Sequence, residues 1–190
     1  LVLNGSLLLL AQPVSRYNTF SYNVNEGLLQ TTIGDMAFDQ NNFCWLSFPN
    51  GIQKFDGKNF TTVPVQPGLP DDKLCRLFEC NNGSLLISHS QGISNYNISA
   101  NRFIEVFTFA GNKKGVVQFI GEDDGIVYFY TQTATIVGID VQTFKVVAET
   151  KTSFTDYSSN ASYLPRISKS IVNHKAAFLI NGFLYLWDLK

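Results

Sequence analysis

The sequence predicts an all-β protein, a partial β-propeller of about four blades, each a four-stranded antiparallel sheet. Three observations carry this prediction: the composition, the short apolar segments between polar turns, and an internal repeat of about 40–50 residues. Of the 190 residues, 45% are hydrophobic and 14% aromatic, whereas only 15% are charged. An average soluble domain has about 25% charged residues, so this composition favours packed strands over long charged helices or disordered tails.

The charge balance limits the partners of the chain. Proteins that bind nucleic acid or anionic membrane surfaces do so through clusters of Lys and Arg. Here 14 basic residues are balanced by 15 acidic ones, and the net charge is −1. We therefore expect this region to bind no nucleic acid.

Short apolar segments, rather than a helical periodicity, run along the chain. Apolar residues do not recur at helical spacing over any long window, and polar turns interrupt them about every ten residues. The segments expected to be strands are Ile33–Phe38, Phe43–Phe48, Gly51–Phe55, Leu74–Glu79, Ser84–His89, Ile93–Asn97, Val116–Gly121, Ile126–Thr131, Thr135–Asp140, Lys145–Glu149, Lys169–Asn173, Ala176–Ile180 and Phe183–Trp187. This spacing fits a sandwich, a barrel or a propeller.

The internal repeat selects the propeller. The pairs that recur after about 40 residues are Gly27-Leu28 with Gly68-Leu69, Asn41-Asn42 with Asn81-Asn82, and Gly51-Ile52 with Gly92-Ile93. Each unit then closes with an aromatic outer strand, near Phe60, Phe103 and Phe144. Four strands in such a unit make one blade, and a blade is stable only when its faces are packed against neighbours.

The repeat divides the chain into blades at about residues 17–60, 61–103, 104–144 and 145–190. Residues 1–11 read LVLNGSLLLLA, an apolar run before a small residue, and are expected to be a signal-peptide remnant. A buried first strand is the alternative. The apolar run up to Lys190 favours a fragment end there.

Residues 20–60 carry a more specific pattern: a Gly-Leu turn, an apolar strand ending in Asp, a Trp-Leu pair, and a closing Gly-Ile-X-Lys-Phe-Asp-Gly. The residues that carry it are Gly27, Leu28, Phe38-Asp39, Trp45-Leu46, Gly51-Ile52, Lys54-Phe55 and Asp56-Gly57. The pattern resembles the two-component regulator propeller repeat family. The second unit departs from it, with Leu85-Leu86 in place of Trp-Leu and Asn97 in place of Asp. The resemblance covers residues 17–103 well and 104–190 loosely.

That family forms the periplasmic sensor region of Bacteroidetes-type hybrid two-component sensor histidine kinases. The resemblance implies that residues 12–190 are the N-terminal part of a periplasmic propeller sensor domain, in a protein anchored in the inner membrane. It implies signal transduction in response to an oligosaccharide released from a glycan. The expected partners are this oligosaccharide, the remaining blades of the same protein and a second copy of the chain. The chain itself is expected not to be an enzyme.

Two other functions stay open. One is a secreted or periplasmic propeller scaffold that binds a protein partner. The other is an exported propeller enzyme that acts on carbohydrate, which would need clustered carboxylates, His or Arg on loops. The two histidines and the low charge of the chain weigh against the enzyme.

Two motifs of the first unit invite a chemical interpretation. Asp56-Gly57 is expected to be a hairpin turn, because Gly and Asp tolerate the left-handed backbone of such turns; a ligand-binding carboxylate is the alternative. Trp45 is expected in the core between blades, with stacking on a sugar as the alternative. The glycines expected to serve turns or close backbone approach are Gly27, Gly51, Gly68 and Gly92.

The cysteines and histidines match no metal site. Cys44, Cys75 and Cys80 are expected to be free thiols that act as small buried hydrophobes. Cys75 and Cys80 would face opposite sides if they lay on one strand. No spacing of these residues with His89 or His174 fits zinc. We expect no metal and no cofactor.

Two further motifs are assigned no chemistry. In Ser88-His89-Ser90, His89 is expected to be exposed in a turn, and nothing predicts the geometry of a catalytic triad. The acidic run Glu122-Asp123-Asp124-Gly125 is expected to be an ordinary blade turn. Calcium binding is the alternative, although the spacing of a calcium loop is missing. No catalytic residue is expected, and the ligand-binding residues are not assigned.

The large apolar residues of the strands are expected to lie buried between blades, because burial must offset the conformational entropy lost on folding. They are Ile33, Met36, Phe38, Trp45, Leu46, Ile52, Phe55, Leu85, Ile87, Ile93, Val127, Phe129, Ile136 and Ile139.

Overall fold

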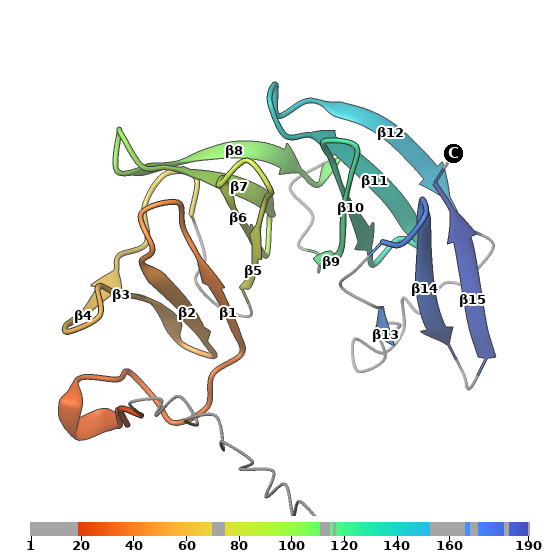
Figure 1. The fold of residues 1–190 in the computed structure, drawn as a ribbon. Helices are drawn as coiled ribbons and strands as arrows, with labels where there is room; N and C mark the ends of the chain where they lie inside the picture. The colour runs from red at the N-terminus through yellow and green to blue at the C-terminus, as the bar shows by residue number, and fades with distance from the viewer. Residues whose placement is uncertain are drawn as a thin grey trace, which may run out of the picture.

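The structure consists of short antiparallel strands in four sheets that stand side by side along the chain (Figure 1). This computed structural model describes residues 19–69, 75–110, 115, 117–152, 166–167, 171–180 and 183–189. In the described residues the one helical element is a single 3-10 turn, Val24–Glu26, which is capped by Asn23. The prediction of an all-β chain is therefore confirmed.

The first two sheets have four strands each, and in both the strands are paired in sequence order. The first comprises β1 (Asp35–Phe38), β2 (Cys44–Phe48), β3 (Gly51–Phe55) and β4 (Phe60–Val63). The second comprises β5 (Arg76–Glu79), β6 (Leu85–His89), β7 (Gly92–Asn97) and β8 (Arg102–Thr108). The polar turns at Asp39–Asn42 and Cys80–Gly83 connect the first and second strand of each sheet, as the repeat predicts.

The third sheet again has four strands, and the described part of the fourth sheet has three. The third comprises β9 (Val117–Asp123), β10 (Ile126–Thr131), β11 (Thr135–Asp140) and β12 (Val146–Lys151). The fourth comprises β13 (Arg166–Ile167), β14 (Lys175–Ile180) and β15 (Phe183–Asp188). Because β12 pairs with β11, the segment after residue 145 completes the third sheet.

One expected strand, Lys169–Asn173, is not formed as predicted. Residues 168–170 lie outside the described residues, and Val172 makes only an isolated bridge with Lys175. Asn173 and His174 have φ of 50° and 61°. Two successive left-handed residues form a tight turn, which ends any extended segment before it.

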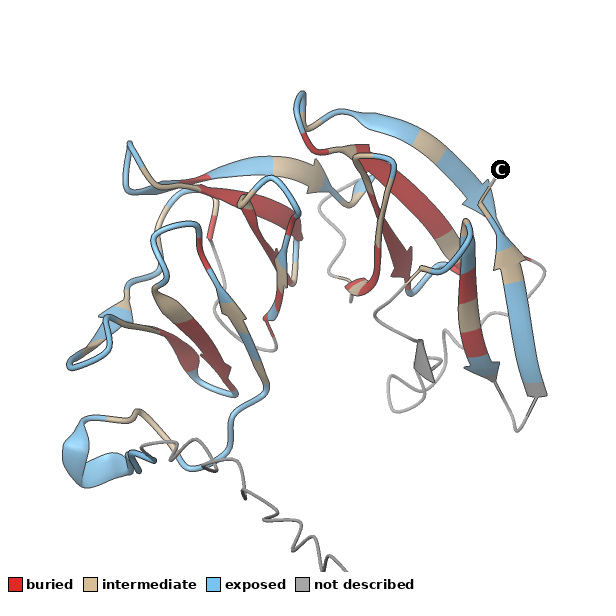
Figure 2. Cartoon of the chain, viewed as in Figure 1, coloured by how far each residue is buried: buried red, intermediate tan, exposed pale blue. Residues whose placement is uncertain are grey.

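Apolar clusters fill the space between neighbouring sheets, and these clusters are the core of the structure. Figure 2 shows buried residues concentrated on the middle strands of the first three sheets and exposed residues on their last strands, β4, β8 and β12. The cluster between the first and second sheets includes Trp45, Ile52 and Leu85. The cluster between the second and third includes Leu86 and Phe129, and the one between the third and fourth includes Phe178. Adjacent residues of β6, such as Leu85 and Leu86, thus serve opposite faces.

Most of the residues expected to be buried are buried. They are Trp45, Leu46, Ile52, Leu85, Ile87, Ile93, Val127, Phe129, Ile136 and Ile139. The prediction is wrong for Ile33, Met36 and Phe38, which are 44%, 57% and 46% exposed, and Phe55 is only half-buried.

For Met36 and Phe38 the exposure follows from the face of the sheet on which they lie. Met36 pairs with Leu46, and Phe38 pairs with Cys44, on the side of the first sheet opposite to Trp45 and the second sheet. That side is covered in part by the N-terminal segment. The Tyr22 ring packs edge-on to Phe55. The expected burial needs a covering sheet, and among the described residues no further sheet lies on this side.

The N-terminal segment is bound to this outer face through one side chain. The Gln53 amide donates to the Gly27 carbonyl at 3.0 Å and accepts from the Leu29 amide at 2.8 Å. Gln53 is 3% exposed, so both polar ends of the buried amide are satisfied. Among the described residues, no helix has the length and apolar character needed to span a membrane.

Two glycines with similar backbone angles test the importance of close chain approach. Gly68 has φ of 81°, and a Cβ there would lie 2.6 Å from the Phe103 carbonyl oxygen. Gly125 has φ of 77°, and a Cβ there would meet nothing within 4 Å. We expect Gly68→Ala to lower the free energy of unfolding by about 1–3 kcal/mol more than Gly125→Ala. Denaturant unfolding measures the difference, and equal losses would show that the contact with Phe103 is unimportant.

Candidate functional site

The candidate site is a pocket of about 370 Å³ between the second and third sheets, beside the β10–β11 turn. One wall comes from the end of β8 and the residues after it. The other comes from the β10–β11 turn with parts of β11 and β12. The lining residues are Phe107, Thr108, Phe109, Ala110, Thr131, Gln132, Thr133, Thr135, Val137 and Glu149.

Two phenylalanines form the apolar wall. The rings of Phe107 and Phe109 lie edge to face with centroids 5.5 Å apart, and both are half-buried. Phe107 also packs edge to face with buried Phe129. The Phe109 amide donates to the Gln91 carbonyl at 3.0 Å, which anchors the chain where β8 ends. Ring packing therefore holds both side chains, and a backbone hydrogen bond also holds the chain at Phe109.

Threonine hydroxyls form the polar wall. The hydroxyls of Thr131 and Thr133 lie 2.9 Å apart, and that of Thr131 also donates to the Thr135 carbonyl at 3.3 Å. Ala134, in the same turn, has φ of 57°, and its carbonyl accepts from both the amide and the hydroxyl of Thr152. These bonds hold an unfavourable left-handed residue in place and keep the turn in one conformation.

The chemistry of the lining favours a neutral ligand that has both apolar faces and hydroxyl groups. Aromatic rings bind the C–H faces of such a ligand, and hydroxyl and amide groups exchange hydrogen bonds with it. Among the lining residues, Glu149 carries the one formal charge. A carboxylate accepts hydrogen bonds from hydroxyls but repels phosphate or carboxylate ligands. The volume lies within the usual range for small-molecule sites.

The motif residues of the first sheet lie away from this pocket and have structural roles. The Asp56 carboxylate accepts from the amides of Lys58 and Asn59, which lowers the pKa of Asp56, and Gly57 has φ of 96°. The expected turn is therefore confirmed. Trp45 is 1% exposed, and its indole N–H donates to the Asp39 carboxylate at 2.9 Å. The core interpretation of Trp45 is confirmed.

The cysteines are free, as expected. Cys75 packs in the cluster between the first and second sheets and Cys80 in the cluster between the second and third, so they face opposite ways. Cys44 is half-buried rather than buried.

The expectation of an exposed His89 is wrong. The ring is 3% exposed, and its Nε2 lies 3.0 Å from the Ser94 hydroxyl of the neighbouring strand. Its Nδ1 accepts from the Gln91 amide at 3.3 Å. His89 is the last residue of β6, so its side chain is held inside the sheet stack by both strands of the hairpin.

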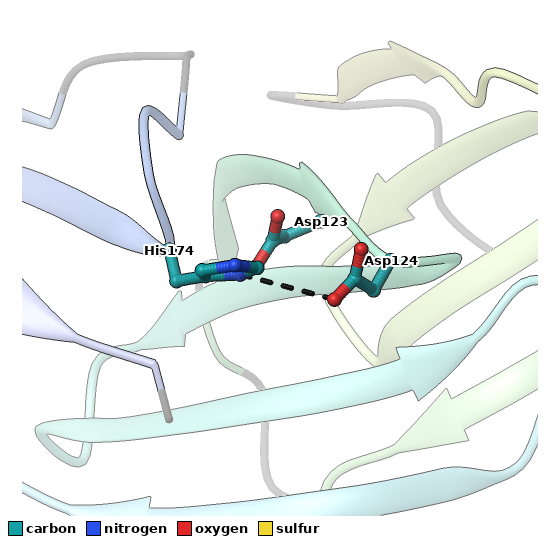
Figure 3. Close-up of side chains that lie close together, drawn as sticks. All are labelled: Asp123, Asp124 and His174. Carbon is teal, nitrogen blue, oxygen red and sulfur yellow. Dashed lines mark hydrogen bonds and ion pairs between the residues drawn. The ribbon is translucent and has the colours of Figure 1, made fainter.

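A second group of polar side chains comes together at the edge of the third and fourth sheets. The sequence predicts separate turns for the run Glu122–Gly125 and for His174. In the structure these turns meet, and His174 lies against Asp123 and Asp124 (Figure 3).

Sequence reasoning did not assign the pocket residues. The repeat predicts an outer strand near Phe103, and this strand, β8, also carries Phe107, but the repeat assigns it no ligand contact. The same holds for the threonines at positions 131–135. The alternate threonines at positions 131, 133 and 135 can be recognised in the sequence. The phenylalanines that complete the pocket come from another blade, and the sequence does not show this contact.

No family model matches the sequence, and no curated protein matches it. The fold is similar to the extracellular domain of a hybrid two-component system from B. thetaiotaomicron, with a TM-score of 0.60 and 16% identity over 90% of this chain and 25% of that chain. It is also similar to apo AztD from Citrobacter koseri, with a TM-score of 0.61 and 14% identity over 83% of this chain and 44% of that chain.

A WD40 domain, that of Neurospora crassa Pan2, matches with a TM-score of 0.52 and 17% identity over 82% of this chain and 49% of that chain. The chain thus spans a quarter of the two-component system domain and less than half of each of the other two. At this level of identity the similarity shows the fold alone. The predicted partial β-propeller is confirmed.

Burial gives the Cys80 thiol a testable property. Desolvation, with smaller contributions from Glu122 and Glu79, raises the pKa of Cys80 from 9.0 to about 12. Because only the thiolate reacts, we expect alkylation of Cys80 in the folded protein at about pH 8 to be about a thousandfold slower than in denaturant. Mass spectrometry of iodoacetamide-treated protein measures this ratio. Rapid native labelling of Cys80 would contradict its position in the core.

Proposed function

We propose that this chain is part of the periplasmic ligand-sensing propeller of a hybrid two-component sensor, and that its ligand is an oligosaccharide released from a glycan. In this proposal the chain binds its ligand and catalyses no reaction on it. Any kinase activity belongs to other parts of the full-length protein. The pocket between the second and third sheets is the observation that carries the proposal. The similarity to the extracellular domain of a hybrid two-component system supports the same class.

The pocket supports an oligosaccharide through its combination of groups. Phe107 and Phe109 offer ring surface for the apolar face of a sugar, and the hydroxyls of Thr133 and Thr135 offer hydrogen bonds. Glu149 adds an acceptor for sugar hydroxyls and disfavours acidic sugars. A pocket of about 370 Å³ takes one or two sugar rings and leaves the rest of a longer chain outside.

Binding of neutral oligosaccharides tests this proposal. We expect calorimetry with a panel of glycan fragments to find at least one neutral ligand. Phe109→Ala should then weaken binding at least about tenfold, because an aromatic contact worth about 0.5–1.5 kcal/mol and its buried area are both lost.

The matched control is Phe60→Ala, which removes a half-buried ring of the first sheet, stacked on Phe55, without touching the pocket. It should bind the ligand as the unchanged chain does. Equal affinity of the Phe109→Ala variant would show that the ligand binds elsewhere. Cleavage of the oligosaccharide during the titration would favour the carbohydrate-active enzyme instead.

Further blades of the same protein are the second proposed partner. On the fourth sheet, Phe178 and Trp187 face the third sheet, whereas Leu179, Leu184 and Leu186 lie on the opposite face. The three leucines are 44%, 69% and 68% exposed. The other sheets pack apolar residues of this kind against a neighbouring sheet. In a propeller, the next blade would cover this face of the fourth sheet.

In the absence of a covering blade, this face should drive association between copies of the chain. We expect the double variant Leu184→Ser, Leu186→Ser to shift light scattering toward the monomer. The control is Val147→Ser, which removes an exposed apolar residue of the outer strand β12. A dilute, sharply unfolding monomer before any substitution would contradict an open blade face.

A protein-binding scaffold is the second candidate function, and the similarity to the Pan2 WD40 domain favours it. The two candidates differ in where binding takes place. A scaffold would bind a protein over loops or blade edges, and Phe109→Ala would then have little effect. An oligosaccharide would bind in the pocket, and Phe109→Ala would then weaken its binding.

A further inference from the structure

Two turns from neighbouring sheets bring three metal-ligating side chains together. Asp123 ends β9, Asp124 begins the turn to β10, and His174 lies in the turn before β14. His174 Nδ1 is 2.5 Å from Asp123 Oδ2 and 3.8 Å from Asp124 Oδ2. Figure 3 shows both carboxylates beside the edge of the imidazole ring. Asp123 and His174 are 51 positions apart in sequence, so only the packing of the two sheets brings them together.

The environment of the cluster suits a cation. With a neutral imidazole, the three side chains carry two negative charges. The side chains of His174 and Asp123 are 28% and 21% exposed, so their charges are partly shielded from water, whereas Asp124 is 77% exposed. The carboxylate of Glu122, the residue before Asp123, is engaged elsewhere, since it accepts from the Asn81 amide of the second sheet at 2.6 Å. The exposed side of Asp124 leaves a path by which an ion can enter.

We propose that Asp123, Asp124 and His174 bind one Zn²⁺ ion, with water as a fourth ligand. Zinc binds imidazole nitrogen and carboxylate oxygen at about 2.0–2.2 Å, which places tetrahedral ligand atoms about 3.3 Å apart. Here one donor from each residue lies within 4.8 Å of the others, and the two distances to His174 bracket the tetrahedral value. Small side-chain rotations therefore complete the site.

The donor set selects zinc over calcium or magnesium. Calcium takes six to eight oxygen ligands at about 2.3–2.6 Å, and magnesium is held by oxygens in octahedral geometry. An imidazole nitrogen together with two carboxylates is a set that zinc binds well. The site also differs from the calcium turn considered for the sequence, because His174 from another sheet supplies one of its three ligands.

The simpler account is a hydrogen bond between His174 and Asp123 with no metal. An ionised carboxylate can only accept, so Nδ1 donates in that bond. When zinc binds, the ring proton of a neutral imidazole lies on Nε2, and the Nδ1 lone pair goes to the metal. Asp124 already lies 3.8 Å from the ring in the structure, so its position does not separate the two accounts. They differ in the effect of removing its charge, because only the metal site uses the Asp124 carboxylate as a ligand.

The proposed ion would fasten the fourth sheet to the third. A ligand that binds only the folded state raises the free energy of unfolding by mass action. The zinc site is independent of the proposed oligosaccharide pocket, because no residue is shared between them. Failure of one proposal therefore leaves the other intact.

Zinc titration of the full chain tests the site. We expect calorimetry with zinc sulfate to show one ion per chain and thermal unfolding to shift upward with zinc. The variant Asp124→Asn, at the most exposed of the three residues, should fold normally and weaken zinc binding at least about tenfold. His174→Asn should abolish binding, while Asn keeps a residue that tolerates the left-handed backbone of the turn.

The matched control is Asp140→Asn, which changes a half-buried carboxylate of the third sheet that accepts from the Thr143 amide. Asp140 does not belong to the Asp123, Asp124 and His174 cluster. This variant should bind zinc as the unchanged chain does. Replacing Zn²⁺ by Co²⁺ should give the visible absorption of a tetrahedral site, and that absorption should vanish in His174→Asn. Absence of zinc binding, or equal binding by the Asp124→Asn and His174→Asn variants and the unchanged chain, would overturn the proposal.

Discussion

The packing of one sheet face against the next is the interaction on which the rest of the structure depends. A single four-stranded sheet cannot cover its own apolar faces, so each sheet relies on a neighbour. Trp45 shows this dependence. It lies on the first sheet, and its ring contacts Tyr96 and Phe103 of the second at centroid distances of 4.5 and 6.2 Å. The pocket and the Asp123–His174 contact both lie where two sheets meet, so both depend on this packing.

Buried polar groups fix the details of the stack. Asp39 is 2% exposed and accepts hydrogen bonds from the Trp45 indole and from the amides of Asn41 and Phe43. One carboxylate thereby holds the β1–β2 turn and orients the largest ring of the core. Removing it would leave three donors without their partner, and a buried donor without a partner costs about 1–3 kcal/mol. Asp39 therefore links the local turn to the packing between sheets.

Local signals predicted much of the fold, whereas contacts between sheets could not be predicted from the sequence. Glycine turns and alternating apolar residues are signals that span only a few neighbouring positions. The bounds of strands such as Gly51–Phe55 could therefore be predicted to the residue from the sequence. Burial at Met36 failed because it depends on what covers a face, and sequence alternation does not show that. The pocket and the cluster at His174 were missed because each joins residues from two blades.

The pairing of strands in sequence order has a consequence for how the chain folds during synthesis. Every strand of the first two sheets pairs only with the strands next to it along the chain, so each sheet can form as soon as its last strand has left the ribosome. Its exposed face then serves as the surface on which the following sheet assembles. The vulnerable interval is the time needed to make about 40 residues, and during it the apolar face is open to other nascent chains.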